Sequence, residues 1–411
     1  MLLLTTLLAL ATAVASAILV GLVRRELLRR DILDRPNARS SHDTPTPRGG
    51  GIGLMAALLP AWIVGNFLFP SGPVATADWL LPLAAAGLAA VSWIDDLRDL
   101  GALPRLAAQF AAAIAGALVL PGLVFQGLFP PWLDTTLAVI GWVWFVNLFN
   151  FMDGIDGISG VESIAIAAGV ALIGGGLSLV PAGMTAQALA IAAATAGFLV
   201  WNWHPAKIFL GDIGSVALGY LLAWLLLSLA AMGEWEVALI LPLYYLADAT
   251  ITLLRRLARR EKVWQAHREH YYQQAVRNGR THARVSIAVA ATNAALVALA
   301  LAAMGDWEAA LILPLYYLAD ATITLLRRLA RREKVWQAHR EHYYQKAVQS
   351  GRTHARVSAA VAVTNLALVA LALAAAATPD GMFFPVLLVC GAAVLVIGLL
   401  AWMRRTPELR P

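Results

Sequence analysis

The sequence has a single cysteine, Cys390, and few charged residues, with Asp, Glu, Lys and Arg making up 14% of its 411 residues. One cysteine excludes a disulfide framework and a metal site built on several thiolates. Hydrophobic residues make up 60% of the chain, which is more than a soluble globular domain carries. The composition therefore predicts a polytopic membrane protein.

Apolar runs close to the length of a membrane span, about 20 residues, recur along the whole chain. We expect an all-α transmembrane bundle of thirteen spans. The runs begin near Leu2, Gly50, Leu80, Leu103, Leu133, Gly157, Met184, Gly214, Val237, Val285, Ala309, Val357 and Pro385.

All 31 Lys and Arg residues lie in alternate loops between these runs, and the loops in between contain none. Basic loops face the cytoplasm, so the first run is expected to be a retained span with its N-terminus outside. No basic residue precedes that run, which argues against a signal peptide. The net charge of +6 then reflects orientation and attraction to membrane lipid headgroups, and nucleic-acid binding is not expected.

The segment NLFNFMDGIDGISG, residues 147–160, places two carboxylates directly after an apolar run. Asp153 and Asp156 are three residues apart and would share a face if the helix continued. Carboxylates at membrane depth are costly and usually functional, and oxygen ligands suit Mg²⁺. The alternative is a solvated loop between two spans.

Two further acidic clusters are expected on the same, cytoplasmic side. The segment SWIDDLRDL contains the adjacent carboxylates Asp95 and Asp96, which repel each other unless a cation or a proton lies between them. The segment WNWHPAKIFLGDIGS contains Lys207 and Asp212. Three acidic clusters on one side of the membrane favour one shared site.

A loop of turn-forming residues, 34–51, contains His42 and Arg48 and ends in three glycines. Arginine side chains and glycine amides at a helix N-terminus both suit a phosphate group. Ordinary cytoplasmic basic charge explains the arginines equally well.

Residues 233–304 recur as residues 305–376, at an offset of 72 and with about nine residues in ten unchanged. We interpret this as a recent tandem duplication of a two-span unit. Two spans are an even number, so the orientation downstream is kept. The expected organisation is a core at 1–232, the two copies, and a last span with a basic tail at 377–411.

Each copy contains a buried carboxylate, Asp248 or Asp320, and a basic cytoplasmic segment with two histidines. A helix-to-helix hydrogen bond is the expected role of the carboxylates. Histidines three apart share a helix face and suit a metal or a phosphate. The arginines nearby favour an anionic substrate. The histidines are His267 and His270 in the first copy and His339 and His342 in the second.

Taken together, five segments resemble the polyprenyl-phosphate N-acetylhexosamine-1-phosphate transferase family. They are DRPNARSSHDTPTPRGGG, IDDLRD, NLFNFMDGIDGISG, FLGDIGS and HREHYYQ, in that order along the chain. The resemblance covers the chain except the extra copy and implies about eleven family spans plus the duplicated unit. It also implies a site on the cytoplasmic face of a bacterial inner membrane, with undecaprenyl phosphate and a UDP-N-acetylhexosamine as substrates.

The implied reaction transfers a sugar 1-phosphate to the lipid phosphate, releases UMP and depends on Mg²⁺, for which Mn²⁺ is a plausible substitute. Asp212 resembles the principal metal ligand, and Asp95 and Asp96 resemble the aspartates that hold the metal or act on the lipid phosphate. The residues that resemble the catalytic or substrate-binding groups are Asp153, Asp156, Asn147, Asn150, His267, His270 and Arg268, with Lys207, His42 and Arg48 as phosphate contacts. If the second copy supplies the loop instead, His339 and His342 take these places.

Two departures from the family pattern are present. The first is the segment HREHYY, which stands where other family members have a triple-histidine loop. In this respect the chain resembles the branch that initiates O-antigen of lipopolysaccharide more than the peptidoglycan branch. The second departure is the duplication. One site needs one histidine loop, and we expect the first copy to provide it because its span follows the eighth by a short turn near Gly233.

Two other functions remain open from the sequence. The DDLRD spacing occurs in intramembrane prenyltransferases, although DGIDG lacks the spacing of their second motif. A transporter of lipid-linked saccharides would use Asp248 and Asp320 as proton relays, although acidic motifs gathered on one face argue against a transport path. A homodimer is compatible with all of these functions.

Overall fold

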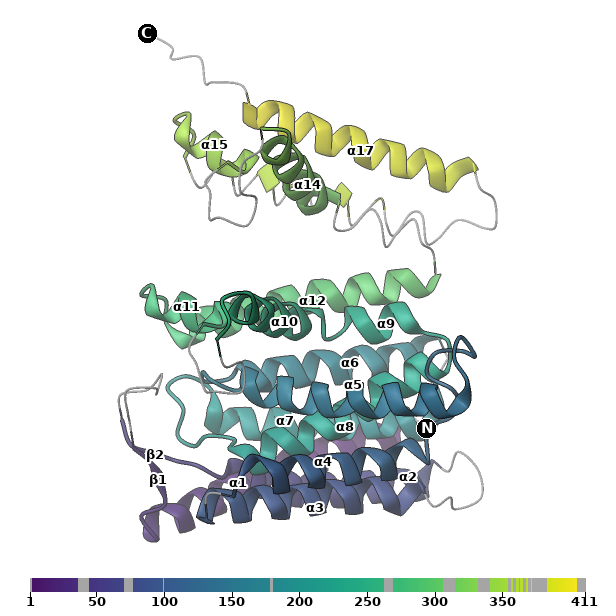
Figure 1. Ribbon diagram of the computed structural model, residues 1–411, viewed down its shortest axis with the longest axis vertical. Coiled ribbons are helices and arrows are strands. Elements are labelled where there is room, and N and C mark those ends of the chain that lie inside the picture. Colours follow the sequence, from purple (N-terminus) through teal and green to yellow (C-terminus); the bar gives the residue numbers. More distant parts are fainter. Residues whose placement is uncertain are drawn as a thin grey trace. The chain divides into compact units, whose positions relative to one another are not determined.

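The computed structural model describes residues 2–35, 44–69, 77–98, 100–177, 180–261, 269–305, 315–331, 341–353, single positions between 356 and 371, and residues 383–404. The described chain is almost entirely helical (Figure 1) and forms two compact units, Met1–Val297 and Ala298–Pro411. Six of its helices are long and apolar enough to cross a membrane. The protein is a polytopic helical membrane protein, and the total of thirteen spans stays a prediction.

The first unit contains eleven helices, the start of a further one and one small strand pair among its described residues. They are α1 (Leu2–Arg29), β1 (Leu33–Asp34), β2 (Thr46–Pro47), α2 (Gly50–Leu68), α3 (Ala77–Arg98), α4 (Ala102–Ala117), α5 (Pro131–Met152), α6 (Ile158–Leu177), α7 (Ala182–Asn202), α8 (Asp212–Ala231), α9 (Trp235–Ile240), α10 (Leu243–Ala258), α11 (Tyr271–Arg277) and the start of α12 (His282–Gly305).

Helix α8 lies at the centre of the first unit and is buried along almost its whole length. It packs against α3 and α5, while α1 and α6 pack against α7. A Cβ on Gly51 would lie 2.3 Å from the backbone nitrogen of Gly214, so α2 and α8 approach each other backbone to backbone where both helices begin. This contact fixes the two N-termini side by side.

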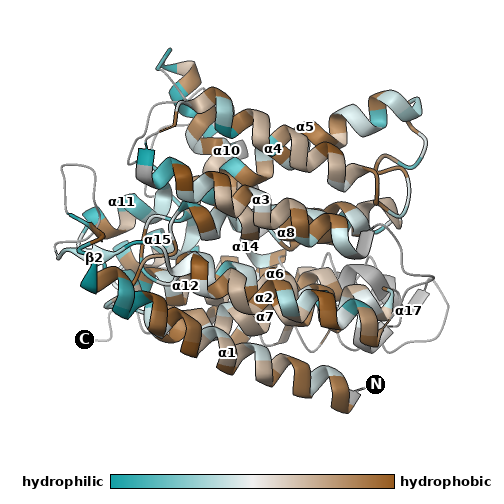
Figure 2. Ribbon diagram, turned by 90° about the horizontal axis from the view of Figure 1, so that it is seen from below, coloured by the Kyte–Doolittle hydropathy of each residue, from teal (hydrophilic) through white to brown (hydrophobic). Residues whose placement is uncertain are grey.

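The polar residues of the first unit gather where β2 and α11 lie, and the bodies of α1 and α2 are apolar (Figure 2). Helices α3, α5 and α7 end at this side, and α2, α6 and α8 begin there. The chain segments that carry the predicted acidic clusters therefore converge on one end of the unit.

Two helical expectations are corrected by the structure. The apolar run from Val237 does not form one helix, because it is interrupted at Leu241 and Pro242 between α9 and α10; proline cannot donate the backbone hydrogen bond that a continuous helix needs. Helix α5 ends at Met152, so Asp153 and Asp156 do not share a helix face.

The second unit contains α14 (Leu315–Ala330), α15 (Tyr343–Gln349) and α17 (Phe383–Arg404) among its described elements. Tyr316, Tyr343 and Ala347 pack with residues of α17 in an apolar cluster. Arg352 donates to the carbonyl oxygen of Trp402 at 2.8 Å and lies over its ring at 4.1 Å.

Candidate active site

Three of the predicted aspartates converge from two elements at the polar end. Asp95 and Asp96 lie in the last turn of α3, and Asp212 is the first residue of α8. The Arg48 guanidinium bridges Asp212, at 2.5 Å, and Asp96, at 3.3 Å. Arg105 of α4 bridges Asp95, at 3.0 Å, and Asp212, at 3.9 Å. The two positive charges thus partly compensate a cluster of three carboxylates.

The position of Arg48 is set by the backbone around it. Phe209 donates its N–H to the carbonyl oxygen of Pro47 at 2.8 Å, and Gly50 donates to the carbonyl oxygen of Phe209 at 2.8 Å. Gly211 has a φ of +73°, which favours glycine, and it turns the chain into α8. Burial lowers the pKa of Arg48, but Asp212 and Asp96 raise it more, so the pKa lies above its ordinary value.

The acidic cluster has unused acceptor capacity. Asp95 Oδ1 and Asp96 Oδ2 are buried and have no hydrogen-bond partner. A buried carboxylate oxygen without a donor is costly, and a divalent cation with oxygen ligands removes that cost. Asp95, Asp96 and Asp212 are therefore a donor set that fits Mg²⁺.

Asp153 belongs to the same electrostatic neighbourhood. It follows α5 directly and is partly buried. Burial raises the pKa of Asp153 to about 6, against a hydrogen bond from Ser159 that lowers it, and the Asp212 carboxylate raises it further. Near neutral pH this group changes protonation more readily than an ordinary aspartate.

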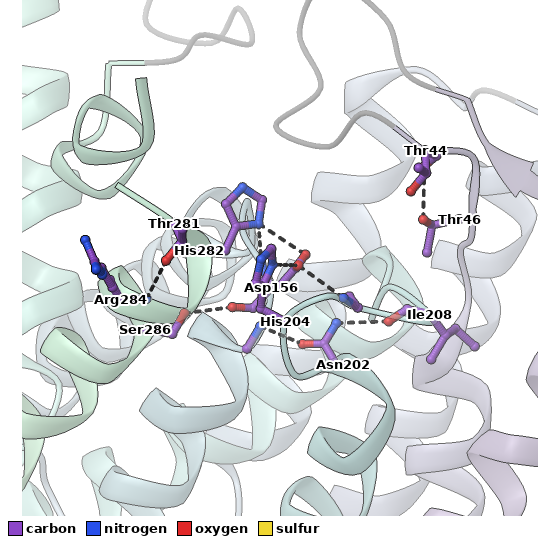
Figure 3. Close-up of polar contacts among 12 residues, drawn as sticks. Thr44, Thr46, Asp156, Asn202, His204, Ile208, Thr281, His282, Arg284 and Ser286 are labelled. Atoms are coloured by element: carbon purple, nitrogen blue, oxygen red, sulfur yellow. Dashed lines mark hydrogen bonds and ion pairs between the residues drawn. The ribbon is translucent and has the colours of Figure 1, made fainter. Parts of the chain in front are cut away.

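Asp156 lies in a second polar cluster with two histidines (Figure 3). Its Oδ2 is 2.6 Å from Nδ1 of His204 and accepts the backbone N–H of Ala206 at 3.1 Å, while Oδ1 is 3.3 Å from Nδ1 of His282. Burial raises the pKa of Asp156, but the hydrogen bonds from His282 and His204 outweigh it and hold the pKa below its ordinary value. The three side chains could also hold a metal ion, because their ligand atoms lie within 4.8 Å of one another.

The backbone around Asp156 is fixed by α7 and α12. Gly157, with a φ of +79°, donates its N–H to Oδ1 of Asn202 at 3.0 Å. Asn202 in turn donates to the carbonyl oxygen of Ile208 at 2.9 Å. Ser286 of α12 donates to the carbonyl oxygen of Asp156 at 2.7 Å (Figure 3). The loop is therefore held from both sides.

Two predicted asparagines lie on α5 before Asp153. Asn147 donates to Oε1 of Gln109 at 2.6 Å and to the carbonyl oxygen of Val143 at 2.8 Å. Asn150 is partly buried, and its carbonyl oxygen accepts the N–H of Asp153 at 3.2 Å. Asn147 links α5 to α4, and Asn150 lies in the last turn of α5.

Lys207 lies near the same end, between α7 and α8. Its ammonium group is over the Trp201 ring at 5.7 Å, and its carbonyl oxygen accepts a hydrogen bond from Arg24 at 3.1 Å. The structure thus places this side chain against an aromatic ring. The predicted phosphate contact His42 lies outside the described residues.

The described histidines of the repeated loop, His270 and His342, each lie directly before a short helix, and the expected shared helix face with His267 and His339 stays a prediction. His270 is the residue before α11, with extended backbone angles. Its Nδ1 is 3.3 Å from Oδ1 of Asp248, which also accepts the N–H of Tyr271 at 2.9 Å. His342 and Asp320 repeat this contact at 3.2 Å. Predicted site residues His267, Arg268 and His339 lie outside the described residues.

Sequence reasoning missed three residues that contact the predicted aspartates: His204, His282 and Arg105. His204 follows Trp203 directly before a proline, and His282 begins a helix in a segment, RTHARV, that recurs in both copies. Neither pattern is distinctive. Arg105 offered a clearer signal, since it is a lone cation in the first turn after the DDLRD cluster.

Known proteins resemble this chain in sequence. The model of the family described as glycosyl transferase family 4 matches residues 79–230. A probable undecaprenyl-phosphate N-acetylglucosaminyl 1-phosphate transferase of Bacillus subtilis is 25% identical over 288 residues, 66% of this chain and 77% of the relative. A decaprenyl-phosphate N-acetylglucosaminephosphotransferase of Mycobacterium leprae is 28% identical over 68% of this chain and 79% of the relative.

A phospho-N-acetylmuramoyl-pentapeptide-transferase of Mycolicibacterium vanbaalenii is 32% identical over 302 residues, 61% of this chain and 83% of the relative. The matched family segment, residues 79–230, contains Asp95, Asp96, Asp153, Asp156 and Asp212. All five aspartates that we predicted from the acidic motifs therefore lie in the part of the chain that matches.

Proposed function

The chain belongs to glycosyl transferase family 4, and from that premise we propose that it transfers an N-acetylhexosamine 1-phosphate from a UDP-sugar to undecaprenyl phosphate and releases UMP. The names of the relatives support a polyprenyl-phosphate acceptor and an amino-sugar 1-phosphate. The observation that carries the proposal is the convergence of Asp95, Asp96 and Asp212, with two buried carboxylate oxygens that have no donor.

In the proposed reaction an oxygen of the lipid phosphate attacks the phosphorus that carries the sugar. The bond from that phosphorus to the oxygen of UMP breaks, and UMP leaves with the electron pair. A phosphate oxygen is already an adequate nucleophile, so the protein mainly has to position two anionic substrates and compensate their charge. Direct attack is therefore proposed in preference to a covalent aspartyl intermediate.

The residues that would hold Mg²⁺ are Asp95, Asp96 and Asp212. Such an ion, when bound, would supply positive charge that offsets the negative charge of a diphosphate. Arg48 and Arg105 already contact these carboxylates and lie at an exposed end of the unit, so they are placed to exchange a carboxylate for a substrate phosphate. Asp153, at the end of α5, is proposed to face the donor from the other side of the cluster.

The first repeat copy is proposed to complete this site. Tyr272 of α11 donates to the carbonyl oxygen of Phe151 at 3.1 Å, and His282 and Ser286 contact Asp156. The proposed setting is the inner membrane, with the N-terminus periplasmic and the site cytoplasmic. The proposed cellular role is the first step of O-antigen or another envelope polysaccharide.

The test is UMP release by purified protein in detergent, with undecaprenyl phosphate, Mg²⁺ and either UDP-GlcNAc or UDP-GalNAc. We expect lipid-dependent UMP formation with one donor. Asp212→Asn should abolish it, and Glu26→Gln, which changes an exposed carboxylate on α1, should not. Folded wild-type protein that is silent with every donor would overturn the proposal and favour a transporter.

A further inference from the structure

One face of α12 carries three polar side chains that all contact a short stretch of the core. His282, Ser286 and Asn293 are spaced by four and seven residues, which places them on one side of a helix. His282 and Ser286 contact Asp156. Asn293 donates to Oε2 of Glu162 at 2.6 Å. Asn293 lies about three helical turns from the start of α12 at the polar end.

The pair formed by Glu162 and Asn293 is closed to solvent, since both side chains have no exposed surface. One oxygen of each side chain, Glu162 Oε1 and Asn293 Oδ1, is buried without a hydrogen-bond partner. Two orphaned acceptors in one pair are unusual, because buried polar atoms are nearly always hydrogen-bonded. A single proton on the carboxyl would turn one of the two acceptors into a donor.

We infer that Glu162 is uncharged and that its proton completes a two-hydrogen-bond pair with the Asn293 amide, which fastens α12 to α6 and so holds His282 against Asp156. In this pair the amide N–H donates to one carboxyl oxygen, and the O–H donates to the amide oxygen. No described cation forms an ion pair with Glu162. The nearby titratable side chains, Tyr244 and Tyr245, carry no positive charge, and their hydroxyls contact Asp248 and Ser159 respectively. A carboxylate without a cation at this depth would be costly.

Glu162 is therefore a positioning residue, which acts on the site through α12. The contact is made by a residue of the first repeat copy, Asn293. The sequence of the second copy has the same asparagine, Asn365, which provides a matched control position. The expected effect of Glu162 on activity rests on the proposed function, whereas its protonation state does not.

The first experiment is infrared difference spectroscopy of wild-type protein and Glu162→Gln in lipid nanodiscs at pH 7.5. Glutamine replaces the protonated acid with an amide of the same shape, which can form both hydrogen bonds. We expect the absorption of a protonated carboxyl in the wild type and its loss in Glu162→Gln. A wild-type spectrum without that absorption, or one that Glu162→Gln leaves unchanged, would overturn the inference.

The second experiment measures UMP release. Glu162→Gln should stay within about twofold of the wild type, whereas Glu162→Ala and Asn293→Leu each leave one buried polar partner unpaired and should lower the rate about tenfold or more. Asn365→Leu, the same change in the second copy, is the control and should leave the rate unchanged. Equal losses from Glu162→Gln and Glu162→Ala, or from both leucine variants, would refute the pair. If the wild type released no UMP, the proposed function would fail, while the infrared result would still decide the state of Glu162.

Discussion

Replacing Asp153 by asparagine should make the protein more stable at neutral pH while it removes a proposed catalytic group. Burial raises the pKa of Asp153 from 3.8 to about 6, a shift of roughly two units. One unit corresponds to about 1.4 kcal/mol, so the ionised carboxylate destabilises the folded state by at most about 3 kcal/mol. The asparagine side chain would not carry that charge, and its amide oxygen can still accept the hydrogen bond from Ser159.

The sign of the pH dependence follows from proton binding. The folded state holds the Asp153 proton more tightly than the unfolded chain does, so this group favours folding at low pH. Its contribution is lost as pH rises from the unfolded pKa near 4 through the folded pKa near 6. We expect wild type and Asp153→Asn to have similar stability below pH 4, and the variant to be the more stable by up to about 3 kcal/mol at pH 7.5.

The assay is equilibrium unfolding in mixed detergent micelles with EDTA, at several pH values between 4 and 8. Repeating it with Mg²⁺ tests the metal site as well, because a bound cation stabilises the ionised carboxylate and should shrink the advantage of the variant. An advantage that is equal at pH 4 and pH 7.5, or a variant that is less stable throughout, would refute the reasoning. Such a gain with loss of activity is typical of functional sites.

Three further predictions concern the metal ligand, the repeat copies and their tyrosines. Asp212→Asn should abolish Mg²⁺-dependent UMP release while the protein remains folded, and a wild-type rate would exclude its metal role. His267→Ala should impair UMP release and His339→Ala should not, while equal losses would refute the assignment to the first copy. Tyr272→Phe removes the hydrogen bond to Phe151 and should cost about 1 kcal/mol of unfolding free energy. Tyr344→Phe, at the exposed second-copy position, should cost almost nothing, and an equal cost would contradict the burial argument.

The sequence predicted the helical membrane fold from its hydropathy. It also predicted that the three acidic clusters lie at one end of the bundle, because basic residues occur only in every second loop between the apolar runs. It left open whether the helix continues from the apolar run into Asp153, and it did not predict that the run from Val237 breaks at Pro242. His204 and His282 were also missed. They reach Asp156 across 48 and 126 residues of sequence, and such contacts depend on how α7 and α12 pack.

The duplicated segment separates what local sequence determines from what packing determines. In both copies an aspartate caps the short helix and contacts the preceding histidine, at 3.3 Å for Asp248 and His270 and at 3.2 Å for Asp320 and His342. Local sequence therefore fixes this cap.

Burial of the two tyrosines that follow is opposite in the two copies. Tyr272 is 1% exposed and Tyr271 39% exposed in the first copy, whereas in the second copy Tyr343 is 5% exposed and Tyr344 43% exposed. The first copy buries its tyrosine against the end of α5, and the second buries the other one in the apolar cluster with α17. Nearly identical sequences thus bury different tyrosines, so duplicating the segment duplicates the cap but does not fix which face of the short helix is buried. The face that the first copy buries is set by partners in the core, among them the carbonyl oxygen of Phe151, Asp156 and Glu162.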